Sequence, residues 1–308
     1  MRNIIDEQDE GSRIDTYLTD CLGNISRTKL QTAIKNGVVT VNSKEIKPSY
    51  LLKIGDTVEF SESEFDEHFS LPIIEPENIP LIVVWEDENM AVINKPSGML
   101  THPTASEYSG TLVNALLYHY KNNLSDVNGD MRRGIVHRLD RNTSGLIMIA
   151  KNNETHEFLV NEMKEHKFQK KYIAIVKGVV KEDNITIDTP IGRHISQSFK
   201  MMINGKDAKD CLSYVKVLER YKDITLVEVT LVTGRTHQIR VHLSSIGHPV
   251  YNDTLYGFGK PKIKTDEQVL EAYKLEFTKP FTPRRISLEI EPDWKFKRIL
   301  DLYKAFSD

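Results

Sequence analysis

The stretch LSYVKVLERYKDITLVEVTL at residues 212–231 decides the fold class. Its two runs, 212–218 and 225–231, are rich in β-branched and alternating apolar residues, so each is predicted to be a strand. Similar runs lie on both sides, at 81–85, 90–94, 146–150, 172–176, 185–187, 273–277 and 286–290, and helices are expected at 112–120, 153–167, 236–246 and 295–306. Strands without regular βαβ alternation predict an α+β fold: a largely antiparallel mixed sheet with flanking helices and loops.

Residues 1–62 are predicted to form a separate, small α/β domain. Apolar residues recur at helical spacing at 13–22 and again before Gly37, and short strands are expected at 38–41 and 57–60. A unit of about 50 residues buries little core, so we expect it to dock a partner rather than to hold a catalytic site. Its basic side chains lie mainly on the second helix and the loops after it: Arg27, Lys29, Lys35, Lys44, Lys47 and Lys53.

A linker is predicted between this unit and the main domain. Residues 63–80 are acidic and contain Pro72, Pro76 and Pro80 without any apolar period. Residues 81–308 then form the main domain, which holds the predicted sheet.

Charge and composition narrow the class of partner. The 308 residues carry 41 basic and 44 acidic side chains, and this balance argues against an indiscriminate polyanion binder. Basic stretches at 24–53, 131–151 and 164–177 nevertheless favour a shaped anionic partner, although any one of them could be ordinary solvated surface. The sequence has no apolar run of the roughly 20 residues that span a bilayer, no signal peptide and two distant cysteines, so we expect a cytoplasmic protein without a membrane partner.

The segment GIVHRLDRNTSG at 134–145 carries the strongest chemical signal. Asp140 lies between Arg138 and Arg141, and nearby cations favour the ionised form of a carboxylate. An ionised acid suits a nucleophile or an electrostatic stabiliser better than a general acid. The alternative is an aspartate that caps a turn or pairs with Arg141.

The segment LVTGRTHQIRVHL at 231–243 is the second candidate. On a helix, Thr236, His237 and Arg240 would lie near one face, which makes Arg240 a candidate partner for a carboxylate from elsewhere in the fold. His237 and His242 are five residues apart, not the four of a helical zinc pair, so no metal site is predicted.

Two further segments are weaker candidates. In KKYIAIVKG at 170–178, Tyr172 could stack on a nucleobase, worth about 1–3 kcal/mol, or could pack in the core. In NKPSGMLTHP at 94–103, Lys95 and His102 could line a cleft. The sequence has no phosphate-cradling glycine loop, dinucleotide fingerprint or serine nucleophile elbow, so an enzyme here would work without a cofactor.

Taken in order, these motifs resemble those of the RluA family of RNA pseudouridine synthases. HRLDRNTSG at 137–145 is the most specific match, and KPSG at 95–98, the Lys171-Tyr172 pair and TGRTHQIR at 233–240 follow the same family's pattern. The N-terminal unit resembles an S4 RNA-binding domain. The resemblance covers nearly the whole chain outside the acidic linker.

The resemblance implies roles for four residues. Asp140 matches the nucleophilic aspartate, Arg240 its arginine partner, and Tyr172 the tyrosine that stacks on the target uracil and is a candidate for proton transfer. Arg138 matches the residue that fills the space left by a flipped nucleotide. The family isomerises uridine in RNA by breaking the N1–C1′ bond and forming a C5–C1′ bond, with no metal or organic cofactor. Whether Asp140 attacks C1′ or C6 stays open.

The resemblance also sets the expected substrate. Specific uridines in structured RNA are expected, with large-subunit ribosomal RNA favoured over transfer RNA, and the protein is expected to be a monomer. Candidate RNA contacts are Arg138, Arg141, Lys95, His102, Leu231, Arg235, His237, Arg27, Lys29 and Lys35. Asn252-Asp253 stands where the family usually has Gly-Asp, and Glu271 and Lys279 where histidines are common; these departures are expected to lie away from the catalytic residues.

Two other functions compete with this interpretation. A non-catalytic RNA-binding or ribosome-associated factor would explain the basic stretches, but not the spread of Asp140, Tyr172 and Arg240 over separate motifs. A glycoside hydrolase or base-excising glycosylase could also use Asp140. Such enzymes usually need a second acid, and the sequence shows no obvious one.

Overall fold

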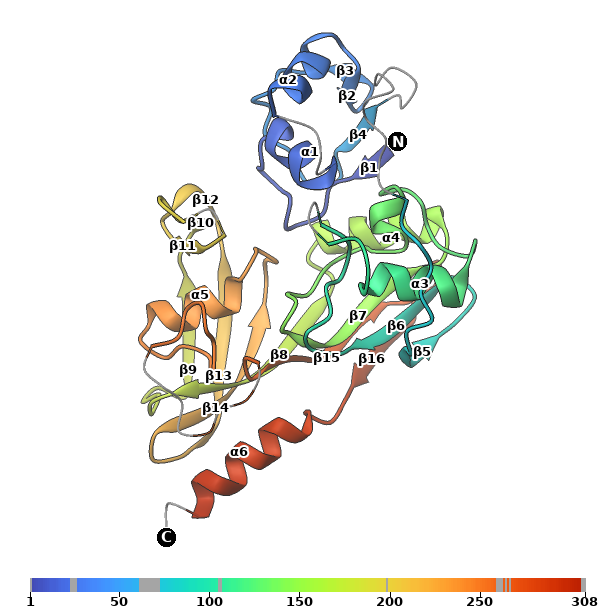
Figure 1. Ribbon diagram of the computed structural model, residues 1–308. Coiled ribbons are helices and arrows are strands. Elements are labelled where there is room, and N and C mark those ends of the chain that lie inside the picture. Colours follow the sequence, from blue (N-terminus) through green and yellow to red (C-terminus); the bar gives the residue numbers. More distant parts are fainter. Residues whose placement is uncertain are drawn as a thin grey trace. The chain divides into compact units, whose positions relative to one another are not determined.

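The computed structural model divides into two compact units, which are described separately below (Figure 1). The first comprises Met1–Lys95, Met99–Leu139 and Ile147–Glu165, and the second comprises Pro96–Gly98, Asp140–Leu146 and His166–Asp308. The structure describes residues 2–22, 27–60, 73–104, 107–197, 199–258, 263, 265 and 267–305, without the side chains of 28 and 29. Within these residues, no helix combines the length and apolar character that crossing a membrane requires.

The N-terminal module has the helix pair and strands that its sequence predicts. Helices α1 (Ile14–Leu22) and α2 (Arg27–Lys35) pack with a four-stranded antiparallel sheet in the order β1-β4-β2-β3. The strands are β1 (Arg2–Ile4), β2 (Val39–Val41), β3 (Lys44–Glu45) and β4 (Thr57–Phe60). Ile14, Leu18, Leu30 and Ile34 are buried in its apolar core. Strand β1 precedes the segment in which strands were expected, and most of the predicted linker lies outside the described residues.

The rest of the first unit contains an antiparallel strand pair and two capped helices. β5 (Ile82–Glu86) pairs with β6 (Met90–Lys95) as expected from the polar turn between them. Helix α3 (Leu112–Tyr120) begins at Thr111, which forms a reciprocal capping box with Asn114, and α4 (Asn153–Lys164) begins after Asn152, whose side chain accepts from the Thr155 amide. Both helices were predicted, although α4 ends three residues before the predicted end.

The second unit is built on an antiparallel sheet, which confirms the predicted fold class. Its strand order is β15-β8-β14-β13-β9, β16 also pairs with β15, and the start of β7 pairs with β15 in parallel. β7 then continues into the first unit, where it neighbours β6. The strands are β7 (Ser144–Ala150), β8 (Gln169–Lys177), β9 (Asn184–Asp188), β13 (Leu212–Arg220), β14 (Ile224–Leu231), β15 (Leu270–Thr278) and β16 (Arg285–Glu289).

Helices α5 (Gln238–Ser245) and α6 (Trp294–Ala305) cover opposite faces of this sheet. The register pairs Tyr172 with Val229 and Leu231 with Ser213, and directly opposite residues share a face, so Tyr172, Leu231 and Ser213 lie on one side. Gln238 of α5 donates from Nε2 to the Ser213 hydroxyl at 2.9 Å, which places α5 on that same side. The apolar side chains of α6 pack on the other face, against the β8 residues that alternate with Tyr172.

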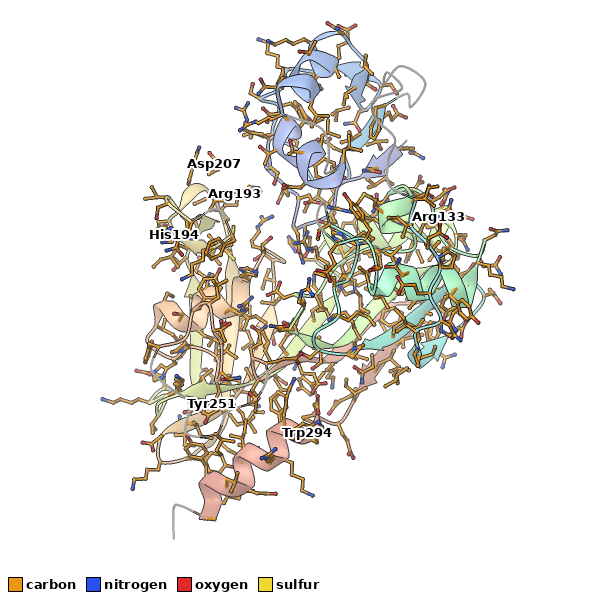
Figure 2. The ribbon with its side chains drawn as sticks, viewed as in Figure 1. Arg133, Arg193, His194, Asp207, Tyr251 and Trp294 are labelled. Atoms are coloured by element: carbon orange, nitrogen blue, oxygen red, sulfur yellow. The ribbon has the colours of Figure 1, made fainter. Side chains whose placement is uncertain are left out.

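A three-stranded sheet, which we call the arm (residues 191–209), was not predicted. It has the order β11-β10-β12, with β10 (Ile191–Arg193), β11 (Met201–Ile203) and β12 (Lys206–Lys209). Its strands are three or four residues long. Figure 2 shows that Arg193, His194 and Asp207 belong to this part of the molecule, and Ile195 is 82% exposed there. Strands this short and polar carry too little periodicity to be recognised in sequence.

Gly145 allows the close approach of β7 to β15. Its φ is +116°, and a Cβ there would lie 2.3 Å from the carbonyl oxygen and 2.6 Å from the amide nitrogen of Ala272. No side chain fits between two backbones at that distance. The segment from Asp140 to β7 therefore depends on a glycine at this position.

We predict that Gly145→Ala lowers the free energy of unfolding by about 3 kcal/mol or more, because an unfavourable φ and a clash with backbone act together. Gly110→Ala is the matched control: Gly110 also has a positive φ, +70°, but no atom of the described residues lies within 4 Å of an added Cβ. The control should cost about 1 kcal/mol, from φ alone. Urea denaturation of both variants tests this, and equal losses would contradict a tight contact at Gly145.

Candidate active site

The loop that carries Asp140 is fastened to the strand beside it. The Thr143 amide donates to the Asp140 carbonyl at 3.1 Å, which closes a turn. Gln268 donates from Nε2 to the Thr143 hydroxyl at 2.9 Å, and Ser144 donates to Glu271 Oε1 at 3.2 Å. Together with the pairing at Gly145, these contacts hold the backbone on both sides of the turn, so Asp140 projects from a fixed base.

Arg240 bridges two carboxylates. Its Nη1 donates to Asp140 Oδ2 at 3.0 Å, while Nε and Nη2 donate to the two oxygens of Asp253 at 2.7 and 3.0 Å. The Asp253 side chain has no exposed surface, whereas that of Asp140 is 20% exposed. The two acids therefore differ in accessibility: Asp253 holds the guanidinium by a bidentate contact, and Asp140 is the acid that a ligand can reach.

The charge on Arg240 is strongly stabilised. Burial disfavours its cation, but the hydrogen bond to Asp253 and the charges of Asp140 and Asp253 raise the pKa of Arg240 above its usual value. The guanidinium thus stays charged at any physiological pH.

A tight turn explains the position of Asp253. Asp253 Oδ1 accepts from the amides of Leu255 and Tyr256 at 2.9 and 3.0 Å. A Cβ on Gly257 would lie 2.2 Å from the Asp253 carbonyl oxygen, so the end of this turn also requires glycine. The preceding Asn252 has φ +61°, a conformation that glycine adopts freely and asparagine tolerates, and its side chain donates to the Thr265 hydroxyl at 2.8 Å.

The expectation that Asn252-Asp253 lies away from the predicted catalytic residues is therefore wrong. Asn252 adopts a positive φ of +61°, and Asp253 directly contacts Arg240. Sequence reasoning missed Asp253 as a site residue, although its place in a family motif was the available signal.

His237 lies beside the Asp140–Arg240 pair. Its Nε2 is 3.9 Å from Asp140 Oδ2, and its Nδ1 is 2.7 Å from the hydroxyl of Tyr256. Helix α5 begins only at Gln238, since the Gln238 side chain accepts from the Arg235 amide and His237 has a left-handed φ of +56°. The predicted helix start at 236 was therefore too early, and helical spacing does not explain why His237 and Arg240 are neighbours.

Tyr172 and Leu231 line the sheet on the side of α5. Both are almost completely buried, with 7% and 8% of their surface exposed. In the register, Tyr172 lies opposite Ala272, which itself pairs with Gly145 just after the Asp140 turn. The backbone of Tyr172 is thus two strands from the loop, and its side chain lies on the sheet face that α5 covers.

The remaining predicted contacts are scattered. Lys95 is fully buried and donates to the Met99 carbonyl at 2.8 Å, so it holds its own loop rather than a surface for RNA. His102 contacts the Pro103 carbonyl, and burial, with the charges of Arg132 and Arg138, lowers the pKa of His102 to about 3.

The three arginines differ in exposure and contacts. The Arg138 side chain is partly exposed and Arg141 is exposed. Arg235 donates to the Asp210 carbonyl at 3.1 Å.

In the N-terminal module, the basic residues differ in role. Arg27 donates to the fully buried Asp15 at 3.0 Å, as does Arg13, and these contacts lower the pKa of Asp15 against the effect of its burial. Arg27 therefore helps to satisfy a buried carboxylate. Lys35, by contrast, is exposed, and the Lys29 side chain lies outside the described residues.

Comparisons with known proteins agree with this architecture. The sequence profile of the RNA pseudouridylate synthase family matches residues 89–245, and that of the S4 domain matches residues 12–58. An uncharacterized RNA pseudouridine synthase of Aquifex aeolicus is 42% identical over 94% of this chain and 93% of its own. Ribosomal large subunit pseudouridine synthase D of Pseudomonas aeruginosa is 38% identical over 96% of this chain and 92% of its own.

A solved structure shares the fold. Human RNA pseudouridylate synthase domain containing 1 superposes with a TM-score of 0.57 at 26% identity, over 69% of this chain and 83% of its own. Fold, family profile and relatives together define the class of the protein as an isomerase that acts on RNA. The chain belongs to the RNA pseudouridylate synthase family and carries an N-terminal S4 domain, as its motifs predicted.

The two carboxylates at Arg240 should differ in their contribution to stability. We predict that Asp253→Ala lowers the free energy of unfolding by about 3–5 kcal/mol, because it leaves a buried guanidinium without its main partner. Asp140→Ala should cost less than about 1 kcal/mol, because Asp140 is partly solvated and Arg240 keeps Asp253. Chemical denaturation measures both values, and a larger loss for Asp140→Ala would reverse the assignment of structural and accessible acid.

Proposed function

We propose that Asp140 is the nucleophile that converts specific uridines of large-subunit ribosomal RNA to pseudouridine. The observation that carries this proposal is the ion pair of Asp140 with Arg240, in which only Asp140 is open to a ligand. Arg240 donates to one oxygen of Asp140 and so orients the carboxylate that would attack the nucleotide.

The reaction needs one nucleophile and a place for a rotating base. Attack by Asp140 forms a bond to C1′ or to C6 and leads to cleavage of the N1–C1′ bond. The uracil turns, C5 bonds to C1′, and the bond to Asp140 breaks, which restores the carboxylate. The proton on C5 is lost and N1 gains a proton, so the isomerisation is redox-neutral. It requires no metal or organic cofactor, and we expect none.

A flipped nucleotide is implied because a stacked base cannot reach a carboxylate, and flipping costs about a few kcal/mol. Tyr172 and Leu231 lie on the sheet face covered by the helix of Arg240, so they are suited to form the wall that holds the uracil. Arg138, two residues before Asp140 and partly exposed, is suited to fill the gap in the RNA.

Ribosomal RNA is the substrate we favour, with transfer RNA as the alternative. Relatives from Zymomonas mobilis, Neisseria meningitidis and Pseudomonas aeruginosa carry the name ribosomal large subunit pseudouridine synthase D. The S4 domain supplies a second RNA-binding surface. We expect the enzyme to act as a monomer in the cytoplasm.

We predict that Asp140→Asn abolishes the release of tritium from RNA labelled at uracil C5, because the amide cannot act as the nucleophile. Asp130→Asn is the control, since Asp130 is an exposed aspartate that pairs with Arg133. It should release tritium like the wild type. Full activity of Asp140→Asn would refute the assignment, and free uracil in the digested product would favour a glycosylase instead.

We predict that the exposed lysines of the S4 domain contact phosphates. The double variant Lys35→Ala/Lys47→Ala should weaken RNA binding and reduce the slope of log K against log salt by about 0.7–0.9 per lost contact. Lys297→Ala, at an exposed lysine of α6, should leave the slope unchanged. Binding titrations across a salt series measure this, and identical slopes for all proteins would show that the module's lysines are merely solvated.

A further inference from the structure

We propose that Tyr256 is a positioning residue for the nucleophile: it fixes the tautomer of His237 so that the Nε2 hydrogen faces Asp140, and it connects the arm to this site. The proposal rests on the proposed role of Asp140. Its effect on Asp140 would pass through His237 and Arg240, which both lie beside that carboxylate.

Two hydrogen-bond partners lie beside the Tyr256 hydroxyl, and one of them has a fixed direction. The Met201 amide can only donate, and it lies 2.9 Å from the Tyr256 oxygen, which therefore accepts. The second partner of the hydroxyl is His237 Nδ1 at 2.7 Å. We assign the phenol proton to this contact, which leaves Nδ1 without a hydrogen and puts that of a neutral ring on Nε2.

The acidity of the phenol supports this direction. Burial, opposed by the Met201 amide and the Arg240 charge, raises the pKa of Tyr256 to about 12. The phenol therefore keeps its proton, and can donate it, throughout the physiological pH range.

The backbone of His237 is held in an uncommon conformation for this contact. A left-handed φ of +56° costs a residue with a Cβ about 1–2 kcal/mol. Such strain persists where the surroundings over-determine it, often at functional sites. Here it presents one ring nitrogen to Tyr256 and the other to Asp140, at 2.7 and 3.9 Å.

Tyr256 also touches the other groups around the nucleophile. Its ring centroid lies 5.1 Å from the Arg240 guanidinium carbon, within the range of a cation–π contact. Its amide donates to Asp253 at 3.0 Å. One residue thus contacts His237, Arg240 and Asp253, which are the groups that surround or hold the Asp140 carboxylate.

The same residue belongs to the base of the arm. Met201, whose amide binds the Tyr256 oxygen, lies in strand β11, and Met201, Ile203 and Tyr256 pack on one apolar cluster with Val241 of α5. A shift of β11 would change the hydrogen bond that orients the phenol. RNA that contacts the arm would therefore act on the orientation of His237.

The decisive measurement is the protonation pattern of His237 by ¹⁵N NMR, which does not depend on catalysis. In the wild type we expect a hydrogen on Nε2 and none on Nδ1 at pH 8. Tyr256→Phe keeps the ring but removes the hydroxyl, and should give a mixture of tautomers. A hydrogen on Nδ1 in the wild type, or an unchanged pattern in Tyr256→Phe, would overturn the proposal.

Kinetics then separate positioning from a purely structural role. Tyr256→Phe should lower kcat about 10- to 100-fold with little change in KM, because the loss lies in alignment. It should cause no further loss in a His237→Ala background, because both changes break the same link between Tyr256 and His237. Independent, multiplicative losses would contradict this link.

Tyr221→Phe, which removes a hydroxyl bound to the exposed Glu219, is the matched control and should be fully active. If Asp140→Asn proved active, the proposed function would fail while the NMR result would still stand.

Discussion

The buried guanidinium of Arg240 is the group on which the rest of the site depends. Removing a cation from water is costly, and the bidentate contact with the fully buried Asp253 offsets that cost. Only one further nitrogen is then needed to orient Asp140, which keeps part of its surface open. The two acids thus have different roles because they differ in burial. The buried Asp253 holds the cation, and the partly exposed Asp140 can meet a ligand.

This division is possible only because the fold brings distant segments together. Asp140 lies 100 residues from Arg240 in sequence, and its loop is fastened to β15 by the glycine contact and by Gln268 and Glu271. The helix of Arg240 is fastened to β13 through Gln238. An error in the register of either strand would move one partner of the ion pair. The register of the sheet therefore sets the positions of Asp140 and Arg240 relative to each other.

Local signals in the sequence predicted much of this. The strands of the sheet and the helices at 112–120 and 153–164 follow from the apolar period, and the family motifs pointed to Asp140 and Arg240. The start of α5 and the left-handed His237 were missed because helical spacing does not show that the Gln238 side chain accepts from the Arg235 amide at the start of the helix. Asp253, Tyr256 and the arm were missed because turns and three-residue strands carry almost no periodic signal.

The structure also bears on the competing glycosidase chemistry, which needs a second acid to protonate a leaving group or to activate water. Asp253 is a second carboxylate beside Arg240, yet both of its oxygens accept from the guanidinium and one also accepts from two backbone amides. With no exposed surface, it cannot reach a substrate or a water at the reacting carbon. His237 also lies beside Asp140, with its Nε2 3.9 Å from the carboxylate oxygen that Arg240 contacts. An accessible carboxylate beside a cation and an imidazole suits the proposed isomerisation, in which the base stays within the site. It suits a glycosylase reaction, which releases the base to water, less well.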